Sequence, residues 1–408
     1  SLSRREFLRL GALTGVATVA AACVAPATPT EPGAAPTTAA PAEPTAAPAA
    51  PGEAPSRFSE APELAEQVQA GALPPVEERL PVNPMVVPVV EEIGQYGGIW
   101  HRGAVGPGDA WAAGRLTYDP LLRWNTDGSA MYPNLCETYE VSEDAREYTF
   151  TLRRGMRWSD GEPFTVDDIM SWYEDGITNA DLFPTFPLWL RDPEQGQPAT
   201  FEKVDDYTLR IVHASPYGLF VEFIAANQGG DMYKWPKHYL AQFHPNHTPM
   251  AELEPQIKAA NFTNWWELFG AKRNQQNGDL PVIAAWVPVQ VPPSVPIVWE
   301  RNPYYWKVDP EGQQLPYIDS VQFEVVESAD LLNLRAVAGE IDCQFRHIAW
   351  NNYPLFVENA EQGDYRVLQW TLAEGSNCVL MLNFTHNDEG LRSLIENKDF
   401  RIALSLGI

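Results

Sequence analysis

Four carboxylates in one short segment are the first side chains whose types and spacing suit chemistry: Asp160, Glu162, Asp167 and Asp168. Paired carboxylates carry out glycoside hydrolysis in many enzymes. Each of these acids also has a plainer role, as a turn former, as a helix cap or as an acid in a first helical turn. We therefore predict no catalytic residue here, and we keep a secreted hydrolase with an α/β fold as an alternative function.

Three histidines, His238, His244 and His247, follow one another in H-x5-H-x2-H spacing. A metal site needs several converging donors. This run lies in a segment that contains Pro245 and Pro249, and no acidic residue is placed as it is in a zinc motif. The pattern therefore favours solvated or capping histidines, and we predict neither a metal nor a cofactor.

Other catalytic motifs are missing from the sequence. The glycine-bearing segment 103–109 lacks both the Lys-Ser/Thr pair of a phosphate-binding loop and the spacing of a dinucleotide fingerprint. No Gly-x-Ser-x-Gly pattern marks a hydrolase nucleophile. We predict that the protein is not an enzyme.

The elements around the carboxylates follow from residue periodicity. Tyr148, Phe150 and Leu152 alternate with polar residues, which predicts a half-buried strand. The pair Asp160-Gly161 predicts a turn. Thr165, followed three residues later by an aspartate, resembles a capping box that begins a helix.

A second patterned stretch runs through residues 301–325, with the sequence RNPYYWKVDPEGQQLPYIDSVQFEV. Alternating Val321, Phe323 and Val325 predict a strand. Ser328 then caps a predicted helix that Gly339 closes. Strand and helix signals alternate in this way through the body of the chain, so the sequence predicts an α/β fold.

These two stretches resemble the signatures of the family 5 extracellular solute-binding proteins, the oligopeptide- and dipeptide-binding-like receptors of ABC importers. Residues 147–168 read EYTFTLRRGMRWSDGEPFTVDD and match the family in about ten ordered positions. Shorter matches occur at 117–125 and 236–240, and the resemblance covers residues 97–408. It implies a periplasmic-binding-protein-like type II fold of two lobes, with an extra subdomain in the first lobe.

The resemblance also implies a domain organisation and a function. We expect the first lobe with its inserted subdomain at 57–319 and the start of a second, incomplete lobe at 320–408. In the family, the segment 400–408 continues into a long C-terminal portion, so we expect this chain to be truncated and to bind its solute poorly alone. The implied function is delivery of a peptide-like solute to the transmembrane subunits of an ABC permease through closure of the two lobes.

The N-terminal residues 1–23 look like a twin-arginine-type lipoprotein signal peptide. Arg4-Arg5 precedes a weakly apolar segment, and small residues lead to Cys23. We predict lipidation at Cys23, with an ordinary cleaved signal as the alternative. Residues 24–56 are rich in Ala, Pro and Thr and predict a disordered tether. This arrangement predicts an extracytoplasmic protein anchored in a membrane by lipid, in the periplasm or on the outer face of the cytoplasmic membrane.

Composition narrows the partners further. The formal net charge of −26 over 408 residues argues against nucleic acid, which requires clustered Lys and Arg. We expect a monomer. Cys136, Cys343 and Cys378 are isolated, so either one disulfide or buried free thiols fit the sequence.

Open α/β lobes bind solutes at the crevice beyond their strand ends, where aromatic rings and a few polar groups hold the ligand. The ligand-binding residues we predict are Trp111, Arg346, His347, Trp350, Asn377 and Asn383. Ordinary core packing is the alternative for each aromatic residue. An oligosaccharide in place of a peptide is the alternative ligand, and an anchored surface-interaction protein without a solute cleft is a further alternative function.

Overall fold

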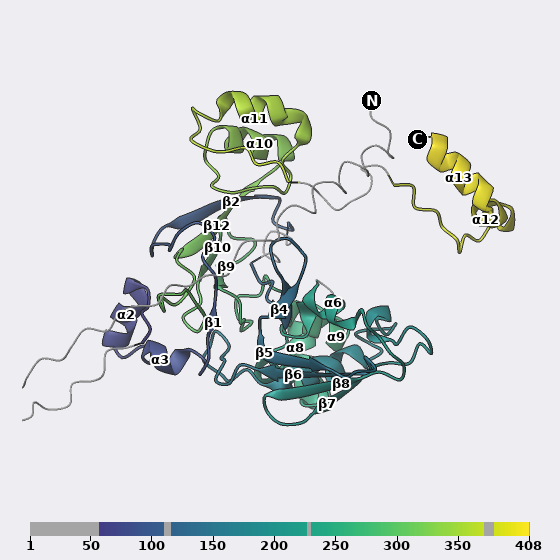
Figure 1. The fold of residues 1–408 in the computed structure, drawn as a ribbon, viewed down its shortest axis with the longest axis horizontal. Coiled ribbons are helices and arrows are strands. Elements are labelled where there is room, and N and C mark those ends of the chain that lie inside the picture. Colours follow the sequence, from purple (N-terminus) through teal and green to yellow (C-terminus); the bar gives the residue numbers. More distant parts are fainter. Residues whose placement is uncertain (1–56, 110–115, 227–229, 371–378, 408) are drawn as a thin grey trace, which may run out of the picture. The chain divides into compact units, whose positions relative to one another are not determined.

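The apolar alternation at 147–152 forms a central strand of a four-stranded antiparallel sheet (Figure 1). The computed structural model describes residues 57–109, 116–226, 230–370 and 379–407. Tyr148, Phe150 and Leu152 are fully buried, which confirms the predicted strand. In hydrogen-bonded order, the strands of this sheet are β5 (Cys136–Val141), β6 (Glu147–Leu152), β8 (Thr208–Val212) and β7 (Thr200–Lys203).

The predicted capping box is present at the start of helix α5 (Val166–Ser171). The backbone N–H of Thr165 donates to Asp168 Oδ2 at 2.9 Å, and the Thr165 hydroxyl accepts from the Asp167 N–H at 3.2 Å. The helix continues as a π-helix, η1 (Trp172–Ile177). Trp172 is buried there, and the apolar face of the helix packs on the core of the first sheet.

A second four-stranded sheet contains strand β2 (Ile99–Val105) and the strand predicted near residue 323, β12 (Ser320–Val326). Strand β12 is central in this sheet, parallel to β2 on one side and antiparallel to β10 on the other. In hydrogen-bonded order, the strands are β2 (Ile99–Val105), β12 (Ser320–Val326), β10 (Ile297–Arg301) and β9 (Trp286–Gln290).

Two short strand pairs and the remaining helices complete the described chain. The strand pairs are antiparallel β3 (Leu122–Trp124) with β4 (Met131–Pro133), and parallel β1 (Met85–Val86) with β11 (Lys307–Val308). The remaining helices that precede β9 in the chain are α2 (Pro62–Gln69), α3 (Val76–Arg79), η2 (Leu188–Leu190), α6 (Phe220–Ala225), α7 (Lys237–Leu240), η4 (Ala241–Phe243), α8 (Met250–Ala259) and α9 (Trp265–Lys272). Those that follow β12 are α10 (Ala329–Val337), η5 (Trp350–Asn352), α11 (Tyr353–Asn359), α12 (Glu389–Glu396) and α13 (Lys398–Gly407).

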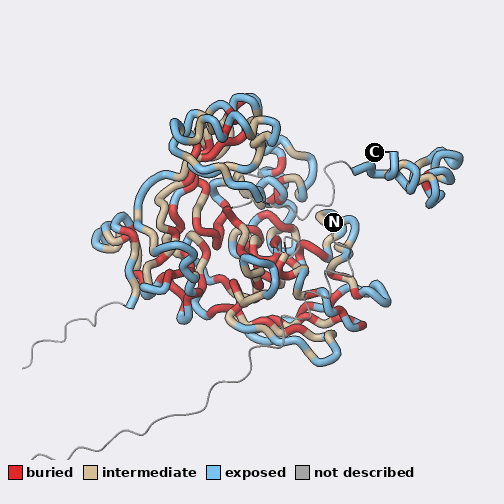
Figure 2. Tube along the Cα trace, turned by 45° about the horizontal axis from the view of Figure 1, so that its top comes forward, coloured by how far each residue is buried: buried red, intermediate tan, exposed pale blue. Residues whose placement is uncertain are grey.

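Buried residues concentrate in the two four-stranded sheets and the elements packed on them (Figure 2). The larger hydrophobic cluster surrounds β5, β6 and β8 and includes the buried Trp158, Trp172 and Trp235. A smaller cluster fills the second sheet around Trp299 and Phe323. Many of the aromatic side chains that the structure describes therefore lie in these two cores.

A buried ion pair joins two of the motifs recognised in the sequence. Lys307 Nζ lies 2.5 Å from Asp119 Oδ1, and both side chains are almost completely buried. The hydroxyl of Tyr305 donates to Asp119 Oδ2 at 3.2 Å, and the backbone N–H of Asp119 donates to the Tyr233 hydroxyl at 2.8 Å. Burial lowers the pKa of Lys307, while the neighbouring Asp119 raises it. This network links segments that lie far apart in the sequence.

The cysteines that the structure describes are free thiols. Cys136 is buried, with its Sγ 3.1 Å from the carbonyl oxygen of Leu121, and burial raises its pKa to about 12. Cys343 is exposed, and Cys378 lies outside the described residues.

We expect Lys307→Met to reduce the free energy of unfolding by about 3–5 kcal/mol, because it leaves the Asp119 carboxylate buried without its cation. Chemical denaturation followed by tryptophan fluorescence measures this change. The matched control is Lys258→Met, since Lys258 faces Glu254 at 3.9 Å on the surface of α8. That change should cost less than about 1 kcal/mol. Equal effects of the two substitutions would contradict the proposed weight of the buried pair.

Candidate functional site

Strands β2 and β12 end together at one edge of the second sheet. They run parallel in unbroken register, from Ile99 opposite Ser320 to Val105 opposite Val326. The Gly106 N–H extends the ladder by donating to the Val326 carbonyl at 2.8 Å. Ligands of α/β proteins bind beyond the carboxyl ends of parallel strands. This edge is therefore the candidate solute-binding site.

The segment that follows α10 covers the free edge of β2. The Asp342 N–H donates to the His101 carbonyl at 3.1 Å, and the His101 N–H donates to Asp342 Oδ2 at 2.6 Å. Two residues further along each strand, the Gln344 carboxamide accepts from the Gly103 N–H at 3.3 Å and donates to its carbonyl at 3.2 Å. An edge strand otherwise exposes these backbone groups. The segment thus holds the residues after Gln344 close to the strand ends.

Glycine at position 103 is required by the approach of α10. A Cβ atom built on Gly103 would lie 2.0 Å from Leu332 Cδ1. Leu332 itself is fully buried and belongs to a cluster with Val326 and Ile341. The absence of a side chain therefore lets α10 pack directly over β2.

Asp109 organises two of the predicted ligand-binding residues. Its Oδ1 accepts from Arg346 Nε at 2.7 Å, and its Oδ2 lies 2.9 Å from His347 Nε2 and accepts from the Val105 N–H at 3.1 Å. Only 2% of the Asp109 side chain is exposed. Burial alone would raise the pKa of Asp109, but the Val105 N–H and the two side chains hold it below its usual value.

The loop that carries His347 is fixed from the other side by α10. The buried Asn333 donates to the His347 carbonyl at 2.7 Å and accepts from the Ala349 N–H at 3.0 Å. His347 adopts a φ of 63°, a left-handed conformation that is uncommon outside glycine. The backbone is therefore positioned by its surroundings, and Arg346 and His347 face the strand ends as a pair held by Asp109.

The other predicted site residues differ in their surroundings. Trp350 is 69% exposed and stacks on Tyr353 with ring centroids 5.0 Å apart. Asn383 is exposed and accepts from the Thr385 N–H at 3.0 Å within a turn. Trp111, Asn377 and the predicted lipid attachment residue Cys23 lie outside the described residues. Their roles as ligand contacts or attachment points stay predictions.

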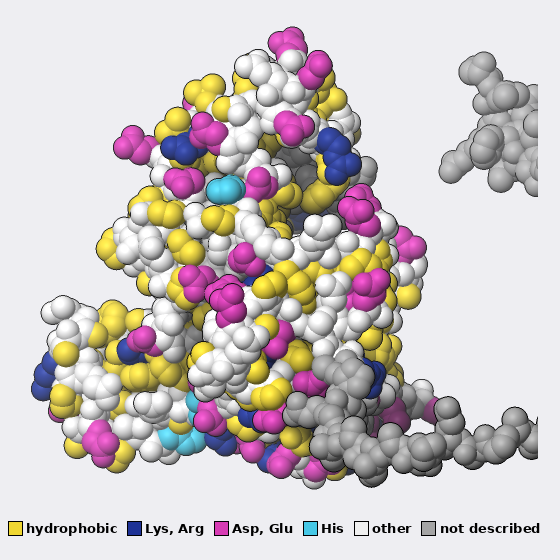
Figure 3. Space-filling model, turned by 90° about the vertical axis from the view of Figure 1, so that its left-hand side faces the viewer, with side chains coloured by type: hydrophobic (Ala, Val, Ile, Leu, Met, Phe, Trp, Pro, Cys, Tyr) yellow, Lys and Arg dark blue, Asp and Glu magenta, His cyan; other side chains and the backbone are white. Residues whose placement is uncertain are grey.

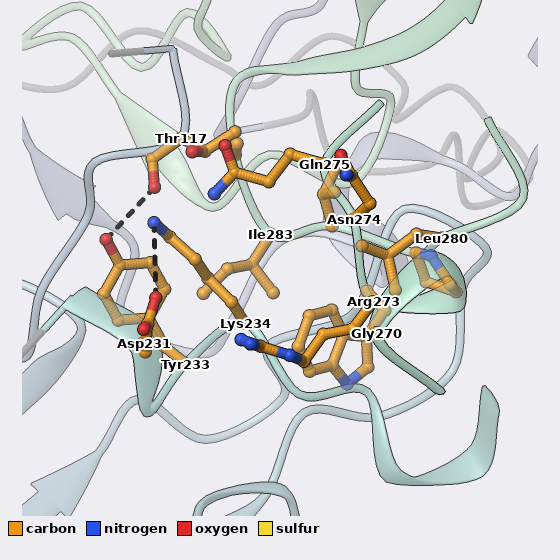
Figure 4. A pocket seen from close by; sticks show the side chains of 14 residues that line it. Thr117, Asp231, Tyr233, Lys234, Gly270, Arg273, Asn274, Gln275, Leu280 and Ile283 are labelled. Carbon is orange, nitrogen blue, oxygen red and sulfur yellow. Dashed lines mark hydrogen bonds and ion pairs between the residues drawn. The ribbon is translucent and has the colours of Figure 1, made fainter. Parts of the chain in front are cut away.

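A cavity of about 220 Å³ is lined by residues from several separate segments (Figure 4). Thr117, Tyr233, Lys234, Arg273 and Gln275 are among the residues that line it. Tyr233 connects the cavity wall to the buried network, because its hydroxyl donates to the Thr117 carbonyl at 3.1 Å. Sequence analysis did not single out these residues, since they come from separate segments without a shared motif.

Three of the four carboxylates considered first, Asp160, Asp167 and Asp168, have structural partners, and that of Asp167 is Lys203 Nζ at 2.7 Å. Asp160 Oδ2 lies 2.8 Å from His238 Nε2. Asp168 caps α5, and its Oδ1 also accepts from the Lys237 N–H at 2.9 Å. Burial raises the pKa of Asp168 to about 6, against the effect of these hydrogen bonds. The hydrogen bonds of both residues are those of a turn and a cap, the roles that the sequence favoured.

The histidine run does have an acidic neighbour, contrary to the sequence analysis. Asp175, in the π-helix, lies 2.7 Å from His247 Nε2 through its Oδ2, and His244 completes a group whose donor atoms lie within 4.8 Å of one another. His244 Nδ1 accepts from the Asn246 N–H at 3.2 Å, and the Asn246 side chain donates to Asp175 Oδ1 at 3.0 Å. The sequence missed Asp175 because nearly seventy residues separate it from the histidines. In this structure the group forms a hydrogen-bond network.

The ends of the parallel strands in the second sheet are the part of this fold where an α/β binding protein would hold a ligand. The family model described as bacterial extracellular solute-binding proteins, family 5 middle, matches residues 130–408. The chain therefore belongs to the family 5 bacterial extracellular solute-binding proteins. This membership confirms the predicted family and its α/β fold class of periplasmic-binding type.

Individual relatives point to more than one kind of ligand. The chain is 31% identical over 373 residues to a periplasmic alpha-galactoside-binding protein of Rhizobium meliloti (strain 1021), which covers 84% of this chain and 50% of the relative. The solved structure of an oligopeptide-binding protein, OppA, has a TM-score of 0.74 and 42% identity, and covers 86% of this chain and 55% of that one. The structure of MelB from Agrobacterium fabrum C58 in complex with stachyose has a TM-score of 0.57 and 28% identity, over 75% of this chain and 46% of that one.

The chain spans about half the length of the curated relatives that it matches. Those relatives are binding proteins by name, and the family is extracellular or periplasmic. Among the helices of the described residues, none is both long enough and apolar enough to cross a membrane.

We expect Asp109→Asn to loosen the segment 342–352. Arg346 and His347 each contact a different carboxylate oxygen of Asp109, and a carboxamide has only one oxygen that can accept a hydrogen bond. Amide hydrogen exchange in that segment should become several-fold faster at pH 7, while Asp279→Asn, in an exposed turn, should leave it unchanged.

The pH dependence of the same contact has a defined sign. Since the folded-state pKa of Asp109 is lowered, its stabilising effect is present above the unfolded-state value of about 4 and is lost as the pH falls through the lower folded value. Corrected for intrinsic exchange rates, protection of 342–352 should therefore persist from pH 7 to about 4 and decline below. Equal protection in the Asp109→Asn variant would show that the carboxylate does not fasten the segment.

Proposed function

We propose that the intact protein is an extracytoplasmic receptor that captures a peptide-like solute and delivers it to an ABC import permease. The observation that carries this proposal is membership of the solute-binding family, combined with the strand-end edge where Asp109 holds Arg346 and His347. Such a receptor needs no chemistry of its own, in keeping with the structural partners of Asp160 and Asp168.

Closure of two lobes is the mechanism that this proposal requires. A solute that touches both lobes only in the closed state favours closure by its difference in affinity for the two states. We propose the first lobe, with its inserted subdomain, in residues 57–319. Strand β12 lies just beyond this boundary and is hydrogen-bonded on both sides within the second sheet. We therefore extend the proposed first lobe to Val326 and propose that the chain crosses to the second lobe after that residue.

Two ligand classes each have support from a similar protein. The similar structure with 42% identity is an oligopeptide-binding protein by name, which favours a peptide. A relative named for alpha-galactosides and a structure containing stachyose favour an oligosaccharide, and this stays the second candidate. Either solute leaves the role of the protein in import the same.

A thermal-shift screen of the mature protein, with Cys23 replaced by Ser, tests the function and separates the two ligand classes. Di- to hexapeptides form one arm, and oligosaccharides including stachyose form the other. A ligand at one hundred times its dissociation constant should stabilise the folded state by about 2.7 kcal/mol. We expect at least one of the peptides to raise the melting temperature. A shift confined to the oligosaccharide arm would assign the second candidate, and no shift in folded, ligand-free protein would count against the proposed function.

We further propose that Cys23 carries lipid and that residues 24–56 tether a monomeric receptor to the membrane. The small residues before Cys23 and the Ala/Pro/Thr-rich composition that follows support this arrangement. Metabolic labelling with a palmitate analogue in bacteria should mark the protein and place it in the detergent phase on partition. Cys23→Ser should abolish both. A label that persists in the Cys23→Ser variant would place the lipid on another residue, and an unlabelled parent protein would favour an ordinary cleaved signal.

A further inference from the structure

The 220 Å³ cavity concentrates positive charge in a strongly acidic protein. The chain has a formal net charge of −26, and acidic side chains are scattered over the face shown in Figure 3. The cavity instead receives the side chains of Lys234, from the segment before α7, and Arg273, from the end of α9 (Figure 4). Such a reversal of sign in a concave site needs an explanation.

The single carboxylate beside these cations does not balance them. Asp231 lies 4.0 Å from Lys234 Nζ, at the limit of an ion pair, and 55% of its side chain is exposed to solvent. Among the described residues, no carboxylate lies within ion-pair distance of Arg273, whose guanidinium lies 5.1 Å from the centroid of the Trp235 ring. Among its described lining residues, the cavity therefore has two cationic side chains and one carboxylate, which is more than half exposed to solvent.

The charge of Arg273 also acts on Lys234. Burial lowers the pKa of Lys234, Asp231 partly opposes this effect, and the charge of Arg273 lowers the pKa further. Burial likewise lowers the pKa of Arg273, and Asp231 opposes this effect too. Like charges held near one another in a half-buried site are unfavourable unless an anion joins them. The lowered pKa values of Lys234 and Arg273 are consistent with an anion site whose anion comes from outside the chain.

The cavity also offers a neutral hydrogen-bonding group, and the segment that carries this group reaches the loop after β2. Gln275 lines the cavity, and its carboxamide has no hydrogen-bond partner among the described residues. The next residue, Gln276, donates to the Pro107 carbonyl at 3.4 Å. Gln276 and Asp109 line a second, much smaller space beside Trp299 and Phe323. The segment 274–276 therefore connects the cationic cavity with the loop after β2.

We propose that the cavity receives a carboxylate group of the solute, held between the Lys234 ammonium and the Arg273 guanidinium while the rest of the solute lies along the strand edge. This inference rests on the proposed receptor function. It assigns an acidic group to the solute, which a peptide supplies at its C-terminus and a neutral oligosaccharide such as stachyose lacks. An independent small carboxylate ion would use the same contacts.

Acetate and its neutral isostere acetamide probe the cavity without knowledge of the solute. The probes are titrated into the mature protein, and the Arg273 Nε–H signal, assigned by its loss in Arg273→Lys, reports occupancy by nitrogen-15 NMR. We expect acetate, and not acetamide, to shift this signal with saturation. Lys234→Met should weaken acetate binding about tenfold or more, because it removes a charged hydrogen-bond donor and keeps the aliphatic stem.

A second variant should change acetate affinity in the opposite direction. Asp231→Asn removes the competing carboxylate and should tighten acetate binding several-fold, whereas a general loss of structure would weaken binding in both variants. Lys258→Met, on the exposed face of α8, should change nothing. Equal shifts with acetate and acetamide, or acetate affinity that Lys234→Met and Asp231→Asn leave unchanged, would overturn the assignment of an anion site.

Competition with the solute found by the thermal-shift screen completes the test. If the solute's carboxylate occupies the cavity, the solute should displace acetate, and its C-terminal amide should bind at least tenfold more weakly. Acetate bound without competition would overturn the solute assignment and leave the receptor function standing. A screen without any solute, beside normal acetate binding, would instead remove the proposed receptor function and assign the cavity to a free carboxylate ion.

Discussion

The buried ion pair between Lys307 and Asp119 is the interaction on which the rest of the structure depends. It joins the segment before β3 to β11, and Tyr305 and Tyr233 complete the hydrogen bonds of the aspartate and its backbone. A buried charge that loses its partner is costly, so these segments have little freedom to separate. Since the Tyr233 hydroxyl also donates to the Thr117 carbonyl, the same network shapes the wall of the cationic cavity.

The strand-end edge depends on a second constraint, the parallel pairing of β2 with β12. Strands so far apart in the sequence become neighbours only through a long connection, which here contains the whole first sheet and its helices. Side-chain and backbone groups of Asp342 and Gln344 then cover the outer edge of β2. The result is a closed sheet margin from which Arg346 and His347 reach Asp109.

The ion-pair network and the paired strands supply rigidity, and the cavity and the strand edge are the proposed binding surfaces. The ion-pair network and the parallel strands fix the cavity and the edge, so the solute that we propose would meet preformed surfaces there. Such preorganisation lowers the entropic cost of association, because fewer groups are ordered on binding. The acidic surface of the protein repels anions in general. In the proposed site, Lys234 and Arg273 would attract an anion whose shape fits the cavity, so charge and shape together would select the solute.

The sequence by itself determined the family, the α/β class and several elements, because these depend on local patterns. Alternation at Tyr148, Phe150 and Leu152 specifies a strand in any context that buries one face, and the Thr165 capping box needs only neighbouring residues. Only the tertiary structure decided which distant residues meet. Asp109 with Arg346, Asp175 with His247 and Lys234 with Arg273 are each brought together by sheet pairing and helix packing. No local periodicity encodes such contacts, because they depend on the simultaneous positions of elements more than thirty residues apart.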